Sequence, residues 1–256
     1  MNLPIGGLGL VGTLMALAVA NSGAQTPSPA TPASPALPVL RIIAPTNNAM
    51  PVAGFAGDRL VDGITKDLGE LLAQRLGRSV RFQGLPSRRV SAALAQGEGD
   101  AICYVLPLWL EGDFNWTRAL IQDASLVASN EADAPALKGL AALAGVPLGT
   151  VLGYRYPRVE QTLGSAFIRS EATSMGGNLR KLVARRVGFA LVEKTSLDYH
   201  LRLHPSDTIK PVWQIERFAA ACAFSKRSSI PMAEVNKAVE AILSDGSVEH
   251  ILARYR

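Results

Sequence analysis

Charge is missing from the start of this chain. The first 24 of its 256 residues contain no Asp, Glu, Lys or Arg, and an apolar run over residues 9–20 ends in small residues at 18–20 and 22–24. This pattern predicts a secretory signal peptide over residues 1–24, cleaved after Ala20 or Ala24. Export of this kind would place the mature protein in the periplasm.

A membrane span and a lipid anchor are also missing. The apolar run is about a dozen residues long, whereas a helix needs about 20 residues to cross the hydrocarbon core, and no later stretch is both long and uncharged enough. Neither of the two cysteines lies near the cleavage region, so a lipoprotein anchor would have no attachment atom. We therefore expect a soluble mature protein.

Motifs for nucleophilic, nucleotide and metal chemistry are scarce. The sequence has no Gly-x-Ser-x-Gly and no Gly-x-x-x-x-Gly-Lys-Ser/Thr, and residues 7–12 match a dinucleotide fingerprint only inside the signal region, with no strand before them. His200 and His204 are four residues apart, but no Glu or Cys beside them completes a metal motif. We expect no catalytic residue, no metal and no cofactor.

A polar tether is expected to precede the folded part. Residues 25–38 are almost entirely Pro, Ala, Ser and Thr, a composition that buries too little apolar surface to fold. About 218 residues remain, enough for one large or two modest domains. The net charge of +5 comes from scattered Lys and Arg, which favours a solvated basic surface over a nucleic-acid partner.

Strand and helix patterns alternate over residues 40–105. Buried strands are predicted at 40–44, 79–82 and 100–105, with a helix at 64–76 and a second helix capped by Ser87 between them. Three strands joined by two helices and short loops are typical of a right-handed parallel α/β lobe.

The same alternation returns in the second half. A connecting strand is predicted at 122–129, strands at 146–152 and 187–192, helix starts at Pro157 and Ser174, another strand at 218–224, and two final helices, the second capped by Ser247. We predict one lobe from residues 39–127 plus 217–256 and another from 128–216. Two crossovers between the lobes would form a hinge with a ligand cleft beneath it.

Several segments resemble the family 3 extracellular solute-binding proteins. The resemblance lies in residues 63–77, 94–101, 149–154, 178–182 and 224–255. It implies an α/β, two-lobed, periplasmic-binding-protein-like (type II) fold, in which each lobe is a mostly parallel sheet flanked by helices and two hinge crossovers join the lobes. It also implies a monomer that carries a small polar solute, such as an amino acid, to an inner-membrane ABC permease.

The site departs from the family pattern. Amino-acid binders of the family place an Arg soon after the third strand to grip the ligand carboxylate, but residues 106–113 contain none. The first-lobe loop at 46–51 and the second-lobe sequence pattern at 186–189 differ from the family too. This leaves the solute open.

Ligands in α/β lobes bind beyond the carboxyl ends of strands, which selects the candidate contacts. The predicted ligand-binding residues are Asn47, Arg88, Tyr104, Trp109, Arg118, Tyr154, Arg155, Ser174 and Glu193, with Arg89 as an alternative to Arg88 and Tyr156 beside Arg155. Ser174 either presents backbone N–H groups to an anion or simply caps its helix, and Trp109 either stacks on a ligand or packs against its lobe.

Other interpretations stay open. The family would place the strands of Cys103 and Cys222 side by side, so these residues form a disulfide or remain two buried thiols. Dehydratases of cyclohexadienyl acids resemble these binders, and Glu193 would be the acid or base of such an enzyme. A third interpretation is a periplasmic sensor module that acts through a partner protein.

Overall fold

The computed structural model describes residue 9 and residues 37–130 and 137–256. The predicted signal peptide, apart from Gly9, and residues 25–36 of the predicted tether lie outside the described residues. Residues 37–256 form one compact unit. None of the helices in the described part of the chain has the length and apolar character that a membrane span needs.

The first lobe is built around β1 (Val39–Pro45). Its parallel neighbours are β4 (Ser79–Leu85) and β5 (Ala101–Val105), and the helices α1 (Ile64–Arg75) and α2 (Ser87–Gln96) connect these strands. The strand–helix–strand–helix–strand order predicted from the sequence is therefore confirmed.

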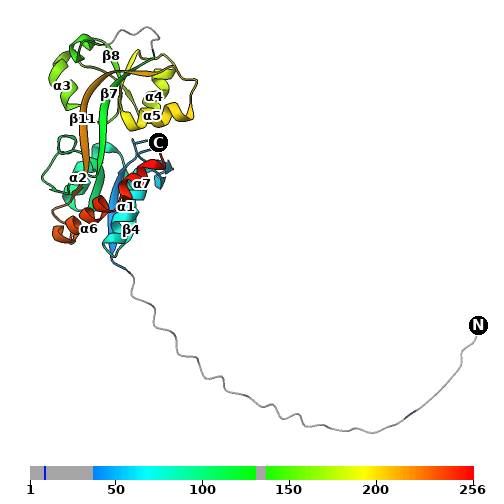
Figure 1. The fold of residues 1–256 in the computed structure, drawn as a ribbon, viewed down its shortest axis with the longest axis vertical. Coiled ribbons are helices and arrows are strands. Elements are labelled where there is room, and N and C mark those ends of the chain that lie inside the picture. Colours follow the sequence, from blue (N-terminus) through cyan, green and yellow to red (C-terminus); the bar gives the residue numbers. More distant parts are fainter. Residues whose placement is uncertain (1–8, 10–36, 131–136) are drawn as a thin grey trace, which may run out of the picture. The chain divides into compact units, whose positions relative to one another are not determined.

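The apolar face of α1 packs into the core of this lobe. Ile64, Leu68 and Leu72 recur at helical spacing and are fully buried or nearly so. Two helices from the end of the chain, α6 (Met232–Ser244) and α7 (Ser247–Ala253), contact α1, as Figure 1 shows. The first lobe therefore combines both ends of the folded chain.

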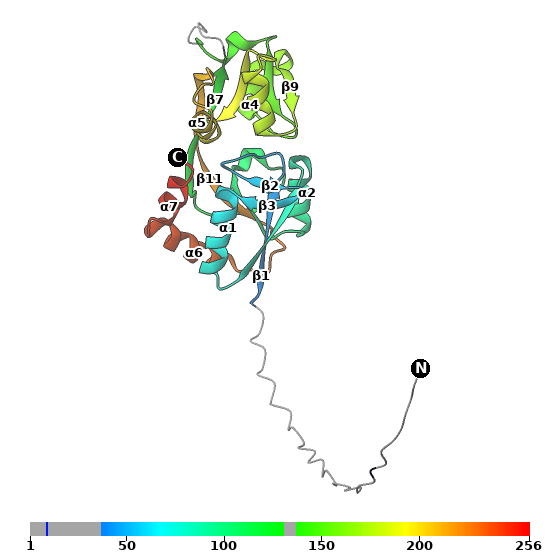
Figure 2. The ribbon, with the colours of Figure 1, turned by 90° about the vertical axis from the view of Figure 1, so that its right-hand side faces the viewer.

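The second lobe repeats the parallel arrangement. Its strand β8 (Pro147–Val151) pairs in parallel with β9 (Ile168–Ala172) and β10 (Phe189–Glu193). Its helices are α3 (Pro157–Leu163), α4 (Met175–Val183) and α5 (Lys194–Leu203). Figure 2 shows α4 and β9 in this lobe, with α1, α6 and α7 in the other.

Two long antiparallel strands join the lobes, β7 (Ile121–Ser129) and β11 (Lys210–Phe224). Residues 210–220 of β11 pair with β7, and residues 221–224 pair with β5 of the first lobe. β7 in turn pairs with β10 of the second lobe. The strand order β4-β1-β5-β11-β7-β10-β8-β9 thus contains the two predicted crossovers, visible side by side in Figure 1.

The remaining elements are short, and sequence patterns missed several of them. They are the hairpin of β2 (Gly54–Ala56) and β3 (Arg59–Asp62), β6 (Asn115–Trp116), and the 3-10 turns η1 (Pro107–Trp109), η2 (Leu140–Leu143) and η3 (Gly164–Ala166). The hairpin, β9 and α5 were not predicted.

Two predicted helix caps are wrong by one residue. Pro86, not Ser87, is the N-cap of α2, and Gly246, not Ser247, is the N-cap of α7; neither helix has a side-chain cap bond. Ser174 does cap α4, because its Oγ accepts a hydrogen bond from the Gly177 N–H at 3.1 Å.

Gly84 in β4 lies close to the backbone of the β2–β3 turn. A Cβ at this position would lie 2.3 Å from the Asp58 carbonyl oxygen, a backbone atom that cannot move aside easily. We expect Gly84→Ala to lower the free energy of unfolding by about 1–3 kcal/mol, measured by urea titration.

The matched control is Gly176→Ala in α4, where a Cβ meets no atom nearer than 3.4 Å. Ala favours a helix interior over Gly by up to about 1 kcal/mol, so this variant should be at least as stable as the wild type. Equal effects of the two substitutions would contradict the steric explanation.

Candidate functional site

A cleft lies where the carboxyl ends of strands from both lobes meet. Its lining includes Pro45 at the end of β1, Val105 at the end of β5, Gly153 just after β8 and Glu193 at the end of β10. It encloses about 1020 Å³ of empty space, its open mouth included. Parallel α/β lobes bind ligands at this edge of the sheet.

Glu193 is a partly buried carboxyl group in the wall of this cleft. It ends β10 and is the N-cap residue of α5, so the pairing of β10 with β7 and β8 fixes its backbone. Burial raises the pKa of Glu193 to about 7, the nearby Asp123 carboxylate adds to the rise, and a hydrogen bond with Ser196 opposes it. The Glu193 carboxyl therefore titrates near neutral pH, well above the ordinary range of a glutamate.

Tyr104 lines the cleft from an irregular point of β5. The register between β5 and β11 pairs Cys103 with Cys222 and Val105 with Ala221, so Tyr104 is the extra residue of a β-bulge, and its φ of 62° is in the left-handed region. Bulges re-aim side chains next to binding sites. A non-glycine residue holds this conformation only when its surroundings stabilise it.

Asp123 in β7 supplies that stabilisation. Its carboxylate accepts hydrogen bonds from the Tyr104 hydroxyl, the Ala124 N–H at 2.7 Å and the Thr195 N–H at 3.2 Å. Burial raises the pKa of Asp123, and the bond from Tyr104 opposes the rise. These contacts join the first lobe, the crossover strand and the start of α5 beneath the cleft.

Both arginines that line the cleft are paired with carboxylates of the protein. Arg155 bonds to Glu111 at 3.1 Å, and Arg158 bonds to Glu216 at 3.3 Å. Their side chains are 43% and 61% exposed, so they lie at the rim.

Direct hydrogen bonds connect the lobes at one side of the cleft. The buried Asn47 side chain donates to the Thr173 carbonyl of the second lobe at 2.7 Å and accepts from the Ser87 N–H of the first lobe at 2.8 Å. The Asn47 carbonyl also accepts from the Met175 N–H at the start of α4. Beside it, the Tyr154 hydroxyl bonds to the Asn48 side chain.

We expect Asn47→Ala to weaken the contact between the lobes. Two buried hydrogen bonds would be lost and their backbone partners left unsatisfied, which should cost about 1–3 kcal/mol of unfolding free energy. Small-angle X-ray scattering should also show a larger radius of gyration.

Asn130→Ala is the matched control. Asn130 is equally buried, but its side chain bonds to the Leu182 and Val187 carbonyls inside the second lobe. It should lose similar stability without a change in the radius of gyration. An Asn47→Ala variant with the wild-type radius would contradict the interlobe role.

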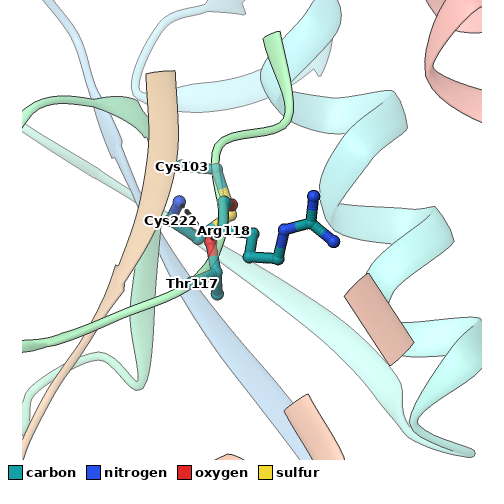
Figure 3. The surroundings of a disulfide bond; sticks show 4 residues. All are labelled: Cys103, Thr117, Arg118 and Cys222. Carbon is teal, nitrogen blue, oxygen red and sulfur yellow. Dashed lines mark hydrogen bonds between the residues drawn. A yellow bond between two sulfur atoms is a disulfide. The ribbon is translucent and has the colours of Figure 1, made fainter. Parts of the chain in front are cut away.

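A disulfide joins the first lobe to the returning strand. Cys103 in β5 and Cys222 in β11 are bonded, with Cα atoms 4.0 Å apart, in the antiparallel pair next to the Tyr104 bulge. Figure 3 shows Thr117 beside the bridge, where its Oγ1 accepts a hydrogen bond from the Cys222 N–H at 3.0 Å.

Five of the predicted ligand-binding residues line the cleft, namely Tyr104, Trp109, Tyr154, Arg155 and Glu193. Asn47, Arg88, Arg118 and Ser174 do not belong to its lining. Arg118 extends away from the disulfide in Figure 3 and pairs with Glu240 of α6 at 2.7 Å, while Arg88 lies 4.0 Å from Glu171. Ligand contact by any of these residues stays a prediction.

Sequence reasoning missed other polar groups of the cleft. Ser87, predicted only as a cap, lines the cleft, and its buried Oγ has no hydrogen-bond partner among the described residues. Arg158 and Glu216 line it as well. Asp123, just behind Tyr104, was also missed.

Similarity to known proteins lies in structure and not in sequence. No protein-family model and no curated protein sequence matches the chain. An ancestral arginine-binding protein bound to arginine superposes with a TM-score of 0.71 at 18% identity, covering 85% of this chain and 97% of its own. The chain has the fold of two-lobed amino-acid-binding proteins.

Two further structures have this binding-protein fold. The amino acid ABC transporter substrate-binding protein AbpA of Streptococcus pneumoniae, bound to L-arginine, has a TM-score of 0.69 at 13% identity, covering 85% of this chain and 94% of its own. An ancestral amino-acid-binding protein described as a precursor of cyclohexadienyl dehydratase has a TM-score of 0.70 at 15% identity, covering 85% of this chain and 95% of its own. The predicted α/β, two-lobed fold is therefore confirmed.

Proposed function

We propose that this protein binds a small polar solute in the cleft between its lobes and delivers it to an ABC importer. The observation that carries the proposal is the cleft itself, formed at the carboxyl ends of strands from both lobes. The arginine-bound neighbours with the same fold support it. The predicted division into residues 39–127 plus 217–256 and residues 128–216 belongs to the same proposal.

Rotation of the two lobes about β7 and β11 would let the permease distinguish the closed, loaded form from the open form. In the described part of the chain, only these two strands carry the sheet from one lobe to the other, so a small change in their twist opens or closes the cleft. A solute that contacts both walls stabilises the closed form. The partner would be an inner-membrane permease, reached in the periplasm after removal of the predicted signal peptide.

A thermal-shift screen of the protein from Gln25 onward tests the proposal. Amino acids, amines, organic acids and sugars are added one at a time. A ligand at 100 times its dissociation constant adds about 2.7 kcal/mol of stability, which raises Tm by about 5–10 °C. Substitution of Tyr154 by Ala should abolish the shift, and substitution of the surface residue Glu240 by Gln should leave it intact. A panel in which no compound raises Tm would contradict solute binding.

A dehydratase-like enzyme is the second candidate, favoured by one observation. Glu193 has a pKa of about 7 inside the cleft, which suits a general acid or base at neutral pH. An acidic substrate would need a cation, and both arginines of the cleft are already paired. Turnover of prephenate-like acids, lost in Glu193→Gln, would replace the binding proposal with this one.

A further inference from the structure

The charged side chains of the cleft are not fully paired with one another. Its four charged side chains are Arg155, Arg158, Glu193 and Glu216, and the two arginines bond to Glu111 and Glu216. Glu193 is left without a cationic partner among the described residues.

Asp123 adds a second carboxyl group, and it pairs with no cation of the described residues. It receives hydrogen bonds from the Tyr104 hydroxyl, two backbone N–H groups and the Thr195 side chain, all neutral donors. Removing carboxylates from water without a cation costs free energy, and a positively charged ligand would offset that cost. The raised pKa of Glu193 reflects the same uncompensated environment.

Aromatic rings line the same cleft. Trp109 is held by an edge contact with Phe218, at 5.1 Å between ring centroids, and Tyr154 lies 6.3 Å from Tyr156. Ring faces attract ammonium groups, and together with an acidic side chain they form the usual surroundings of an organic cation. Most of the remaining wall is aliphatic, which suits an apolar body on the ligand.

A ligand carboxylate would find no unpaired cationic group among the described residues that line this cleft. Besides the paired arginines, the start of α4 is occupied: the Met175 N–H donates to the Asn47 carbonyl, and the Gly177 N–H donates to Ser174 Oγ. Two of the backbone donors at this helix start are therefore used within the protein, and Ser174 and Met175 lie outside the cleft lining.

From this arrangement we infer that the solute is an organic monoamine, with one protonated amine on an apolar or aromatic body and no carboxylate. The ammonium group bonds to Glu193, the body lies beside Trp109 and Tyr154, and the Ser87 hydroxyl is a free hydrogen-bond partner on the opposite wall. The inference rests on the proposed function, because it names the solute class of the same cleft.

Matched pairs that differ only by a carboxylate test it directly. Isothermal titration calorimetry at pH 8 compares phenethylamine with phenylalanine, tyramine with tyrosine, and isoamylamine with leucine. We expect the amine of at least one pair to bind ten times more tightly than its amino acid, or better. Equal or reversed preference overturns the inference and leaves solute binding intact.

The remaining outcomes separate the inference from the proposed function. If none of these amines binds and a sugar or organic acid does, the amine assignment is wrong but the proposed solute binding stands. If no small solute binds at all, both fail.

Glu193→Gln keeps the shape of the side chain and removes its charge. We expect it to weaken amine binding at least tenfold. The matched control is Glu70→Gln on the surface of α1, where Glu70 pairs with Lys66, and it should bind as the wild type does. A second variant, Trp109→Leu, should weaken binding of all three amines through loss of the ring. Wild-type amine affinity in Glu193→Gln would overturn the inference.

Discussion

Glu193→Gln is expected to stabilise the ligand-free protein at pH 8 by about 3 kcal/mol and to have almost no effect at pH 4. The reason is the raised pKa of Glu193, about 7 in the folded protein against 4.5 for the ordinary side chain. Below pH 4.5 the group is protonated in both the folded and the unfolded state, so its contribution to stability does not change with pH.

Between pH 4.5 and 7 the unfolded chain releases this proton and the folded protein keeps it. The folded state then binds more protons, so the free energy of unfolding falls as the pH rises, and the full penalty is present above pH 7. Urea titrations of both proteins at pH 4, 6 and 8 measure the difference. Glu70→Gln is again the control, and parallel pH profiles for wild type and Glu193→Gln would contradict the assigned pKa.

Loss of the disulfide is expected to have the largest effect on stability. The bridge joins residues 119 positions apart, so its removal frees a long loop in the unfolded chain, and the double variant Cys103→Ala, Cys222→Ala should lose about 2–5 kcal/mol. Tm should fall by about 5–15 °C.

Reduction provides an independent check of the same quantity. Wild-type protein unfolded in dithiothreitol should approach the stability of the double variant, and dithiothreitol should not affect the variant itself. A loss below about 1 kcal/mol would mean that packing and the backbone hydrogen bonds hold β5 and β11 together without the bridge.

Much of this fold was predictable because buried apolar residues recur at the spacing of helices and strands. The spacing of Ile64, Leu68 and Leu72 identified α1 because all three are buried on one face. α5 was missed because only Ser196 and Leu197 of its residues are buried, which leaves too short an apolar pattern to recognise. Ser87 was misassigned as a cap because Pro86, whose φ of −57° suits the approach to a helix, takes that position.

The expectation that ligand contacts follow the carboxyl ends of strands predicted part of the cleft lining. It did not predict which residues pair with partners far away in the sequence. Tyr104, Tyr154 and Glu193 follow or end buried strands, which is visible in sequence. The pairing of Arg118 with Glu240 joins residues 122 positions apart, which no local pattern reveals. One sequence feature could have identified Asp123, namely that it places a carboxylate inside the otherwise mostly apolar segment of β7. A charged residue in such a strand is a reason to look for a polar partner.

The position of β11 near the end of the chain implies an order of assembly for a chain that emerges N-terminus first. β7, β8, β9 and β10 pair with one another, so the second lobe can form its sheet from a continuous stretch of chain. The first lobe cannot, because β5 keeps an open edge and Cys103 keeps its thiol until residues 221–224 arrive. The first lobe therefore begins to form first but is completed last. During that interval the Cys103 thiol can react with thiols or disulfides of other molecules.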